Sequence, residues 1–365
     1  MRLLVCGGVF VEHLAARRRI GGSGLTAAVT AARLGADVSL ASWVGRGEAD
    51  EAFALLDDAG VDRVGVQILN GLTTTYKISD PADLAAPMPR LTQGAVPNMA
   101  RPALPAARLV LCFGTPGFDA VERGWLDRPV ENATLLFDRQ GPQSKISGVA
   151  MAAMLPASTR VMLTNVHEAL AETRARDLAG AVHHLPPDGF EAAIVKDGPW
   201  GTTVFGPEGF ERPVGAYPVT VGNSIGSGDV FGGALGARLL AGDEPPAAAD
   251  VAAAAAAAWV TGTYNQPPAD FADVIAALRE AQPPVWVDRR RLEANRYEVR
   301  TAPALDGRSA ERIARGLRYL GMETSPSARE PEVVQVAATG SDPVAAAIGA
   351  AITTMRGSVG TLPHP

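Results

Sequence analysis

Short runs of apolar residues recur along this chain, and segments with helical spacing separate them. Residues 3–6, 109–113 and 135–137 are continuously apolar, whereas a strand with one face in water alternates apolar and polar residues. Strands buried on both faces are typical of parallel sheets that helices cover on both sides. The pattern therefore predicts an α/β fold with a central, mostly parallel sheet between two layers of helices.

The individual elements follow from these runs and from the spacing between them. Helical spacing is found over residues 24–36, 48–60 and 165–179, and the first two helices are expected to end at Gly35 and Gly60. Residues 80–107, rich in Pro, Ala and Met, show little periodicity and receive no assignment. The expected strands are residues 2–8, 37–45, 63–69, 73–79, 108–114, 133–139, 160–165, 192–198 and 201–206.

A domain boundary is expected at residues 283–284, where two prolines follow a helical segment. A new series of strand-like and helix-like stretches begins after them. A chain of 365 residues also has the length of roughly two domains. We therefore expect a main α/β domain over residues 1–282 and a small α/β extension of unknown role over residues 285–365.

The charge balance limits the classes of partner. The chain has 33 Lys and Arg residues against 39 Asp and Glu residues, a net charge of −6, which does not favour nucleic-acid binding. The one basic run, residues 17–19, is expected to be a solvated loop. No apolar stretch has the length of a membrane span. Cys6 and Cys112 lie in apolar runs and are expected to be core thiols, so we expect a cytoplasmic protein.

The stretch of residues 223–240 has the strongest chemical signal. Gly226, Ser227 and Gly228 form a turn, Asp229 follows at once, and an Ala- and Leu-rich helix begins there. The free N–H groups at the start of a helix attract negative groups. Asp229 is therefore either a residue that stabilises the helix start or a carboxylate that acts on a ligand whose anionic group occupies the turn.

A second candidate lies at the junction between the strand at residues 160–165 and the following helix. Asn165 and Glu168 stand three residues apart, which is the spacing of a capping box. Taken alone, this spacing favours capping. The alternative is that the two hard oxygen donors organise Mg²⁺ and its water molecules near phosphates.

Two glycine turns complete the set of candidates. Gly198 and Gly201 lie at the turn of an expected hairpin, where they either admit a nucleotide or only form the turn. Lys196, just before this turn, either approaches a nucleotide phosphate or is an exposed strand lysine. The other turn, residues 21–24, leads into a helix, and its simplest role is a close crossing of the backbone over the sheet.

Together these motifs resemble those of the PfkB, or ribokinase-like, carbohydrate kinases. The glycine turn and helix at residues 21–35 are similar to the N-terminal element of that family. The Asn-x-x-Glu motif is present at residues 165–168, and the small-Gly-Ser-Gly-Asp-x-Phe motif at residues 225–231. The order and spacing of the three motifs agree with the family over residues 1–280.

The resemblance implies a ribokinase-like, three-layer α/β/α fold with a reduced lid, and an ATP-dependent transfer of the γ-phosphate to a hydroxyl group. It implies that residues 226–228 form an anion hole for that phosphate and that Asp229 is the base that accepts the hydroxyl proton. It further assigns ATP to Lys196, Gly198 and Gly201, a water-mediated Mg²⁺ to Asn165 and Glu168, and the substrate to Glu12, Gly21, Gly22 and Thr26.

The chain also departs from the family pattern. Glu12 stands where sugar kinases usually have an aspartate, and Thr26 stands where an asparagine is frequent, so ribose itself is a doubtful substrate. Residues 223–225 are Asn-Ser-Ile in place of Asp-Thr-Thr, which puts activation by a monovalent cation in doubt. Only residues 13–20 separate Glu12 from Gly21, so the lid must be short or differently built.

Two hypotheses follow from these observations. The first is an ATP-dependent kinase for a small sugar, a nucleoside or a related alcohol, with no nucleic-acid or membrane partner. The resemblance also allows a homodimer. The alternative is a catalytically weak protein of the same fold that serves in binding or regulation.

Overall fold

The computed structural model describes residues 1–14, 17–78, 90–92, 104–114, 132–140, 150, 157–262, 264–290, 316 and 319–320. The strands are β1 (Arg2–Cys6), β2 (Phe10–Leu14), β3 (Arg17–Gly21), β4 (Asp37–Gly45), β5 (Asp62–Leu69), β6 (Thr75–Ile78), β7 (Arg90–Thr92), β8 (Leu109–Phe113), β9 (Thr134–Asp138), β10 (Thr159–Asn165), β11 (Ala192–Lys196), β12 (Thr202–Phe205) and β13 (Glu211–Val214). The helices are α1 (Ser23–Arg33), α2 (Ala49–Ala59), α5 (Val166–Thr173), α6 (Leu178–Ala181), α7 (Ser227–Ala241), α8 (Pro245–Val260) and α9 (Phe271–Ala281).

A nine-stranded sheet forms the centre of the molecule, in the order β13-β12-β11-β10-β9-β8-β1-β4-β5. All pairs from β11 to β5 are parallel, and β12 and β13 add to one edge in antiparallel orientation. The predicted strands at residues 133–139, 160–165, 192–198 and 201–206 are therefore confirmed as β9 to β12. The prediction of a mostly parallel sheet is confirmed as well.

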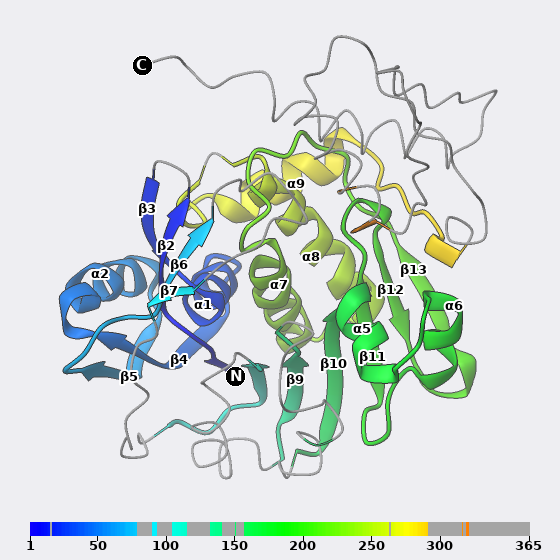
Figure 1. The fold of residues 1–365 in the computed structure, drawn as a ribbon, viewed down its shortest axis with the longest axis horizontal. Helices are drawn as coiled ribbons and strands as arrows, with labels where there is room; N and C mark the ends of the chain where they lie inside the picture. Colours follow the sequence, from blue (N-terminus) through cyan, green and yellow to red (C-terminus); the bar gives the residue numbers. More distant parts are fainter. Residues whose placement is uncertain are drawn as a thin grey trace.

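Helices lie on both faces of this sheet, which gives three layers (Figure 1). Leu3 and Val5 of β1 belong to the core under α1, α2, α7, α8 and α9. The next residues along the same strand, Leu4 and Cys6, point to the opposite face and pack with Val166 of α5. This two-sided burial explains why the strands are apolar without alternation.

A second, four-stranded sheet has the order β3-β2-β6-β7, and we call it the lid because it contains the segment in which the lid was expected. The short segment at residues 13–20 is long enough to build part of this sheet, because β2 and β3 pair directly as a hairpin. β6 then pairs with β2. Figure 1 shows β2, β3 and β6 extending together beyond the main sheet. The expectation of a solvated loop at residues 17–19 is wrong, because these residues form β3, in which Arg17 and Arg18 are exposed and Arg19 is buried.

Residues 285 and 287, which follow the expected boundary at residues 283–284, form hydrogen bonds with residues that precede it. The amide of Val285 pairs with Ala216, and the amide of Val287 donates to Trp200. Residues 316 and 319–320 are also described, whereas the other elements expected in the extension lie outside the described residues. Of the unassigned segment 80–107, the structure describes β7 and residues 104–107.

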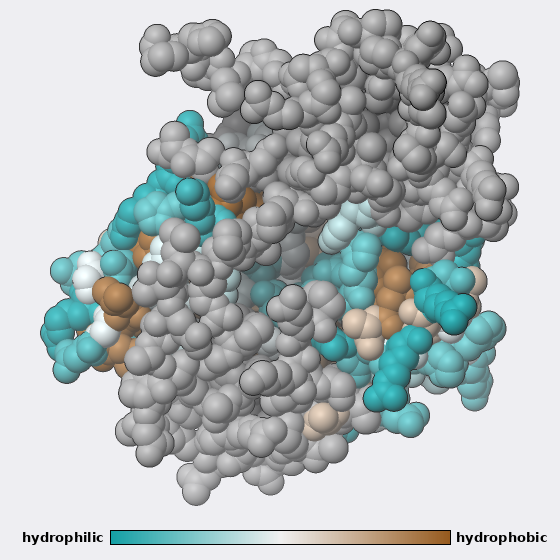
Figure 2. Space-filling model, in the orientation of Figure 1, coloured by the Kyte–Doolittle hydropathy of each residue, from teal (hydrophilic) through white to brown (hydrophobic). Residues whose placement is uncertain are grey.

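Hydrophilic side chains dominate the described surface in Figure 2, and hydrophobic ones occur there in small patches. In the described part of the chain, the large hydrophobic residues with high exposure are Met1, Val64, Ile68, Leu72 and Phe210. Among the described residues, no helix combines the length and the apolar character needed to cross a bilayer.

Helices α1 and α7, which carry two of the sequence motifs, are in unusually close contact. A Cβ atom on Gly233 of α7 would lie 2.3 Å from the carbonyl oxygen of Ala27 in α1. Only glycine allows this backbone approach, because an atom at that distance from a carbonyl oxygen would force the helices apart. The close contact sets the position of the α7 start relative to the turn that precedes α1.

We predict that Gly233→Ala lowers the free energy of unfolding by about 1–3 kcal/mol, because the added methyl group overpacks the contact with Ala27. Gly236→Ala on the same helix is the matched control, since its Cβ would meet the side chain of Leu3 at an ordinary 3.5 Å. Urea unfolding of both variants tests this prediction. Equal stabilities for the two variants would contradict it.

Candidate active site

The predicted motifs meet at the carboxyl edge of the parallel sheet. β9, β10 and β11 end at Asp138, Asn165 and Lys196, and α7 begins beside these ends at Ser227. In open α/β sheets, ligands bind in the crevice outside the carboxyl ends of the strands. The topology thus brings together residues from three separate motifs and from β9, which sequence analysis did not select.

Asp229 lies in the first turn of α7, and its carboxylate accepts a hydrogen bond from Nε2 of Gln140 at 3.3 Å. Burial raises the pKa of Asp229 to about 7, and the negative charges of Asp138 and Glu12 add to this effect. The positive charge of Lys196 opposes the increase. A carboxyl group with a pKa near neutrality is suited to proton transfer at physiological pH.

Lys196 forms a buried ion pair with Asp138, with 2.8 Å between Nζ and Oδ2. Burial acts to lower the pKa of Lys196, but the charges of Asp138, Glu168 and Asp229 outweigh burial and raise it. Lys196 is therefore a permanent cation among three carboxylates. The alternative of an exposed strand lysine is wrong, since only 15% of the side chain is accessible.

The glycine turn before α7 lies next to this cation, and the amide of Ser227 within it donates to the carbonyl of Ser224 at 3.2 Å. Gly226 has a φ of +84°, a left-handed conformation that favours glycine. A Cβ atom on Gly228 would lie 3.5 Å from Nζ of Lys196, so the lysine points at the first turn of the helix. A helix start with an adjacent cation is a site for an anion.

Glu12 and the N-terminal glycine turn also come together. The carboxylate of Glu12 accepts hydrogen bonds from Nε of Arg19 at 2.6 Å and from the amide of Gly22 at 3.1 Å. A Cβ atom on Gly21 would lie 2.9 Å from that carboxyl group, so a larger residue at this position would displace the carboxylate from these hydrogen bonds. Thr26 is buried in α1. Both oxygens of Glu12, the carboxylate expected to bind the substrate, thus accept hydrogen bonds from other residues of the protein.

Asn165 and Glu168 form a complete capping box at the start of α5. The amide of Glu168 donates to Oδ1 of Asn165 at 3.0 Å, and the amide of Asn165 donates to Oε2 of Glu168 at 2.9 Å. Thr164 also donates to the Glu168 carboxylate. The capping interpretation of this spacing is therefore correct, and any role toward a metal ion is additional to it.

The hairpin turn between β11 and β12 contains Gly198 and Gly201, both with left-handed φ angles. A Cβ atom on Gly201 would lie 2.4 Å from the carbonyl oxygen of Val214 in β13. The second glycine is thus required by the approach of the neighbouring strand. A Cβ atom on Gly198 would meet Leu320 at 3.9 Å, which is an ordinary contact. Glycine is therefore favoured at residue 198 by the left-handed backbone conformation and not by lack of space.

A C-terminal clasp, which we define as residues 286–290 and 319–320, holds this turn. Arg289 forms a buried ion pair with Asp197 at 2.7 Å and donates to the carbonyl of Tyr319 at 3.1 Å. His167 of α5 also bonds to that carbonyl, and the indole N–H of Trp200 donates to the carbonyl of Leu320 at 3.0 Å. The clasp therefore ties the turn to α5.

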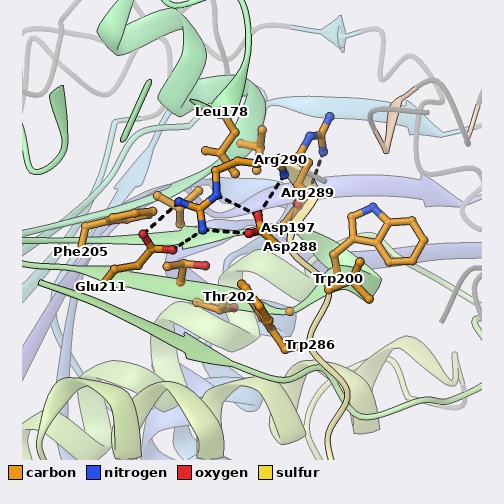
Figure 3. A pocket seen from close by; sticks show the side chains of 15 residues that line it. Leu178, Asp197, Trp200, Thr202, Phe205, Glu211, Trp286, Asp288, Arg289 and Arg290 are labelled. Carbon is orange, nitrogen blue, oxygen red and sulfur yellow. Dashed lines mark hydrogen bonds and ion pairs between the residues drawn. The ribbon is translucent and has the colours of Figure 1, made fainter. Parts of the chain in front are cut away.

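Figure 3 shows the crevice inside this clasp, where Arg290 lies between Glu211 and Asp288 and Arg289 points to Asp197. The crevice has a volume of about 10 Å³, which is room for about one water molecule. It is thus a packed seam behind the turn and is too small for a nucleotide.

Sequence analysis missed three residues of this site. Asp138 is the last residue of the buried strand β9 and Gln140 lies two residues beyond it, so the carboxyl end of this strand was the available signal. Arg19 was assigned to a solvated run, although β-strand alternation buries one residue in two.

In the part of the chain that the structure describes, no group of three His, Cys, Asp or Glu residues is arranged to hold a metal ion.

The carboxylates around Lys196 nevertheless fit Mg²⁺ bound chiefly by phosphates and water. This cation takes hard oxygen ligands, keeps several water molecules, and needs only one or two protein carboxylates. Asp138, Glu168 and Asp229 supply such oxygens, since all three act on the charge of Lys196. No dedicated protein cage is required for an ion that arrives with a nucleotide.

Comparison with protein families gives one match. The model of the pfkB family carbohydrate kinases matches residues 10–80 and 131–271, which is more than half of the chain. These ranges contain Glu12, the N-terminal glycine turn, the Asn-x-x-Glu motif and the turn before Asp229. No curated protein matches the chain in sequence.

Solved structures share the fold at low sequence identity. A nucleoside kinase from Burkholderia thailandensis, in complex with inosine, has a TM-score of 0.61 at 17% identity and covers 76% of this chain and 98% of its own. A fructokinase from Vibrio cholerae O395, with fructose, ADP and calcium bound, has a TM-score of 0.63 at 16% identity, with 76% and 98% covered. A ribokinase from Cryptococcus neoformans in complex with ADP has a TM-score of 0.59 at 19% identity, with 77% and 99% covered.

We predict that Arg289→Met lowers the free energy of unfolding by about 3–5 kcal/mol, because it removes one charge from a buried ion pair with Asp197. Arg18→Met, which removes an exposed pair with Glu51, is the control and should cost about 0–1 kcal/mol. Chemical denaturation of the full chain measures both. A small effect at Arg289 would show that the clasp adds little to the fold.

Proposed function

The chain belongs to the pfkB family of carbohydrate kinases, and we propose that it is an ATP-dependent kinase for a small sugar, a nucleoside or a related alcohol. The observation that carries the proposal is the arrangement around Asp229. A carboxyl group with a pKa of about 7 lies at a helix start, next to a glycine turn and a buried lysine. That set combines a proton acceptor with a site for an anionic group.

In the proposed reaction, Asp229 accepts the proton of the substrate hydroxyl while that oxygen attacks the γ-phosphorus of ATP. The new O–P bond forms as the bond to the β–γ bridging oxygen breaks, and the electron pair leaves with ADP. Backbone N–H groups of residues 226–228 and the charge of Lys196 stabilise the transferring group. Placement and charge stabilisation are the main demands of this chemistry.

ATP as the phosphate donor is supported by the solved relatives that contain ADP and by the glycine turn that lies beside Lys196 in this chain. We assign the nucleotide to the side of this turn formed by Lys196 and Gly198, with the clasp behind it. Mg²⁺ would neutralise phosphate charge, and Glu168 and Asn165 would hold it through water. The amide at residue 223 in place of a carboxylate gives no support to a monovalent cation site.

The acceptor is proposed at class level. Nucleosides and sugars are bound by the solved relatives, and this chain offers Glu12, Gly21, Gly22 and Thr26 around the corresponding turn.

We also propose a kinase domain over residues 1–282, an extension over residues 285–365 and a cytoplasmic location. The last of these agrees with two buried cysteine thiols, Cys6 and Cys112.

One observation favours the second candidate, a kinase-fold protein for binding or regulation. Both oxygens of Glu12 already accept hydrogen bonds from Arg19 and Gly22. A substrate hydroxyl at this position must share an occupied carboxylate, which weakens binding of a simple sugar. Turnover against a panel of alcohols separates the two candidates.

We predict that the protein releases ADP from MgATP in the presence of one class among sugars, nucleosides and small alcohols. Asp229→Asn should reduce this turnover by about 10²–10⁴-fold, because the amide cannot accept the hydroxyl proton. A coupled ADP assay measures both, and calorimetry checks that the variant still binds ATP. ATP binding without turnover across the panel would favour the regulatory candidate.

The pH dependence of kcat/KM gives an independent test. Asp229 must be deprotonated to act as a base, so the rate should increase with pH through a limb near pH 7. Lys196→Gln removes a charge that lowers the pKa of Asp229, so the limb should move to higher pH. A limb that stays in place in Lys196→Gln would exclude Asp229 as the group that titrates.

A further inference from the structure

Arg19 is a buried arginine in the lid and has no part in the function described so far. It lies on β3 with 4% of its surface exposed, whereas Arg17 and Arg18 on the same strand are exposed. An arginine is almost never fully buried unless its charge is paired, because removing a guanidinium from water is costly. The groups around Arg19 must therefore balance its positive charge and accept hydrogen bonds from its N–H donors.

One side of the guanidinium is bound to the lid itself. Nε donates to Oε2 of Glu12 at 2.6 Å, in an ion pair whose two side chains are 3% and 8% exposed. This bond balances the charge of Arg19. It uses one of the five N–H donors of the side chain.

The other side reaches the glycine turn before α7. Nη2 lies 3.4 Å from the carbonyl oxygen of Ile225, which also accepts a hydrogen bond from the indole of Trp259 at 2.8 Å. A Cβ atom on Gly226 would lie 3.6 Å from Nη2, and the guanidinium carbon lies 5.1 Å from the centre of the Trp259 ring. A lid strand thus delivers a cation to the start of the helix that carries Asp229.

Nη1 of Arg19 is buried and has no hydrogen-bond partner. Almost all buried polar groups are paired, and an unpaired charged donor is costly, so each exception needs an explanation such as a catalytic role or a missing ligand. The location narrows the class of ligand. Nη2 of the same guanidinium lies beside the glycine turn and helix start, and a guanidinium with an unused donor at such a place is suited to a phosphoryl oxygen.

We propose that Arg19 is a catalytic residue whose Nη1 donates a hydrogen bond to an oxygen of the transferring phosphoryl group. The inference rests on the proposed kinase function. Arg19 stays protonated throughout, while the hydroxyl proton goes to Asp229 and the electron pair of the broken P–O bond leaves with ADP. Its role is to stabilise the charge that spreads over the phosphoryl oxygens. Because the charge comes from the lid, the pairing of β2 and β3 is part of the catalytic arrangement.

The test compares two Arg19 variants with a control. Arg19→Ala removes the donor but leaves Glu12 buried without its cation, so it can fail to fold. The double variant Glu12→Gln/Arg19→Met removes both charges and avoids that cost. Arg18→Met, on the same strand and paired with exposed Glu51, is the control with unchanged activity.

Two measurements are made on each folded variant of the full chain. The first is steady-state ADP release, in which loss of Arg19 should lower kcat by about 10²–10³-fold with little change in KM for ATP. Free guanidinium ion should restore part of the rate in Arg19→Ala, which a purely structural role would not allow. The second is calorimetric binding of MgADP with and without aluminium fluoride, a mimic of the transferring phosphoryl group. The native protein should bind MgADP more tightly with the mimic, and the Arg19 variants should lose this gain.

The second measurement keeps this proposal separate from the proposed function. If Asp229→Asn abolishes turnover but a folded double variant keeps the native kcat, the kinase stands and the role of Arg19 is wrong. The same conclusion follows if the variants keep the native gain from aluminium fluoride. If the native protein shows no such gain, the role of Arg19 is also overturned, whatever the turnover assay gives.

Discussion

Lys196 and Asp138 form a buried ion pair at the carboxyl ends of β11 and β9, and the electrostatics of the site depend on it. Without the lysine, Asp138, Glu168 and Asp229 would place three carboxylates close together in a buried region, at a large cost in free energy. With Lys196 present, its single positive charge offsets part of the negative charge of all three carboxylates. The pKa of Asp229 is then high enough for a base near neutral pH and low enough for the deprotonated form to be populated.

The positions of these groups come from backbone contacts that only glycine allows. Gly233 lets α7 approach α1 at Ala27, which sets the distance between the two glycine turns. Gly226 takes the left-handed conformation that aims the first turn of α7 at Lys196. The lid is joined to the same place by Arg19, whose Nη2 lies 3.4 Å from the carbonyl oxygen of Ile225. A small number of close contacts therefore aligns three motifs that lie far apart in the sequence.

Much of the fold was predictable from the sequence because the parallel strands are apolar on both faces. β9 to β11 were found from that property, and Gly60 ends α2 in a left-handed conformation, as expected of a glycine after a helix. The β2–β3 hairpin was not found. Its strands are short and charged, and its arginine run hides the strand alternation that buries Arg19.

The sequence by itself determined the fold class, the family and the order of the motifs, since these depend on local patterns and spacing. It also identified Asp229 as the main chemical candidate. Only the tertiary structure decided that Asn165 and Glu168 form a capping box, that Lys196 pairs with Asp138, and that Arg19 reaches the turn at Ile225. Those contacts join residues from different strands or depend on side-chain direction, and a linear pattern contains neither distance nor orientation.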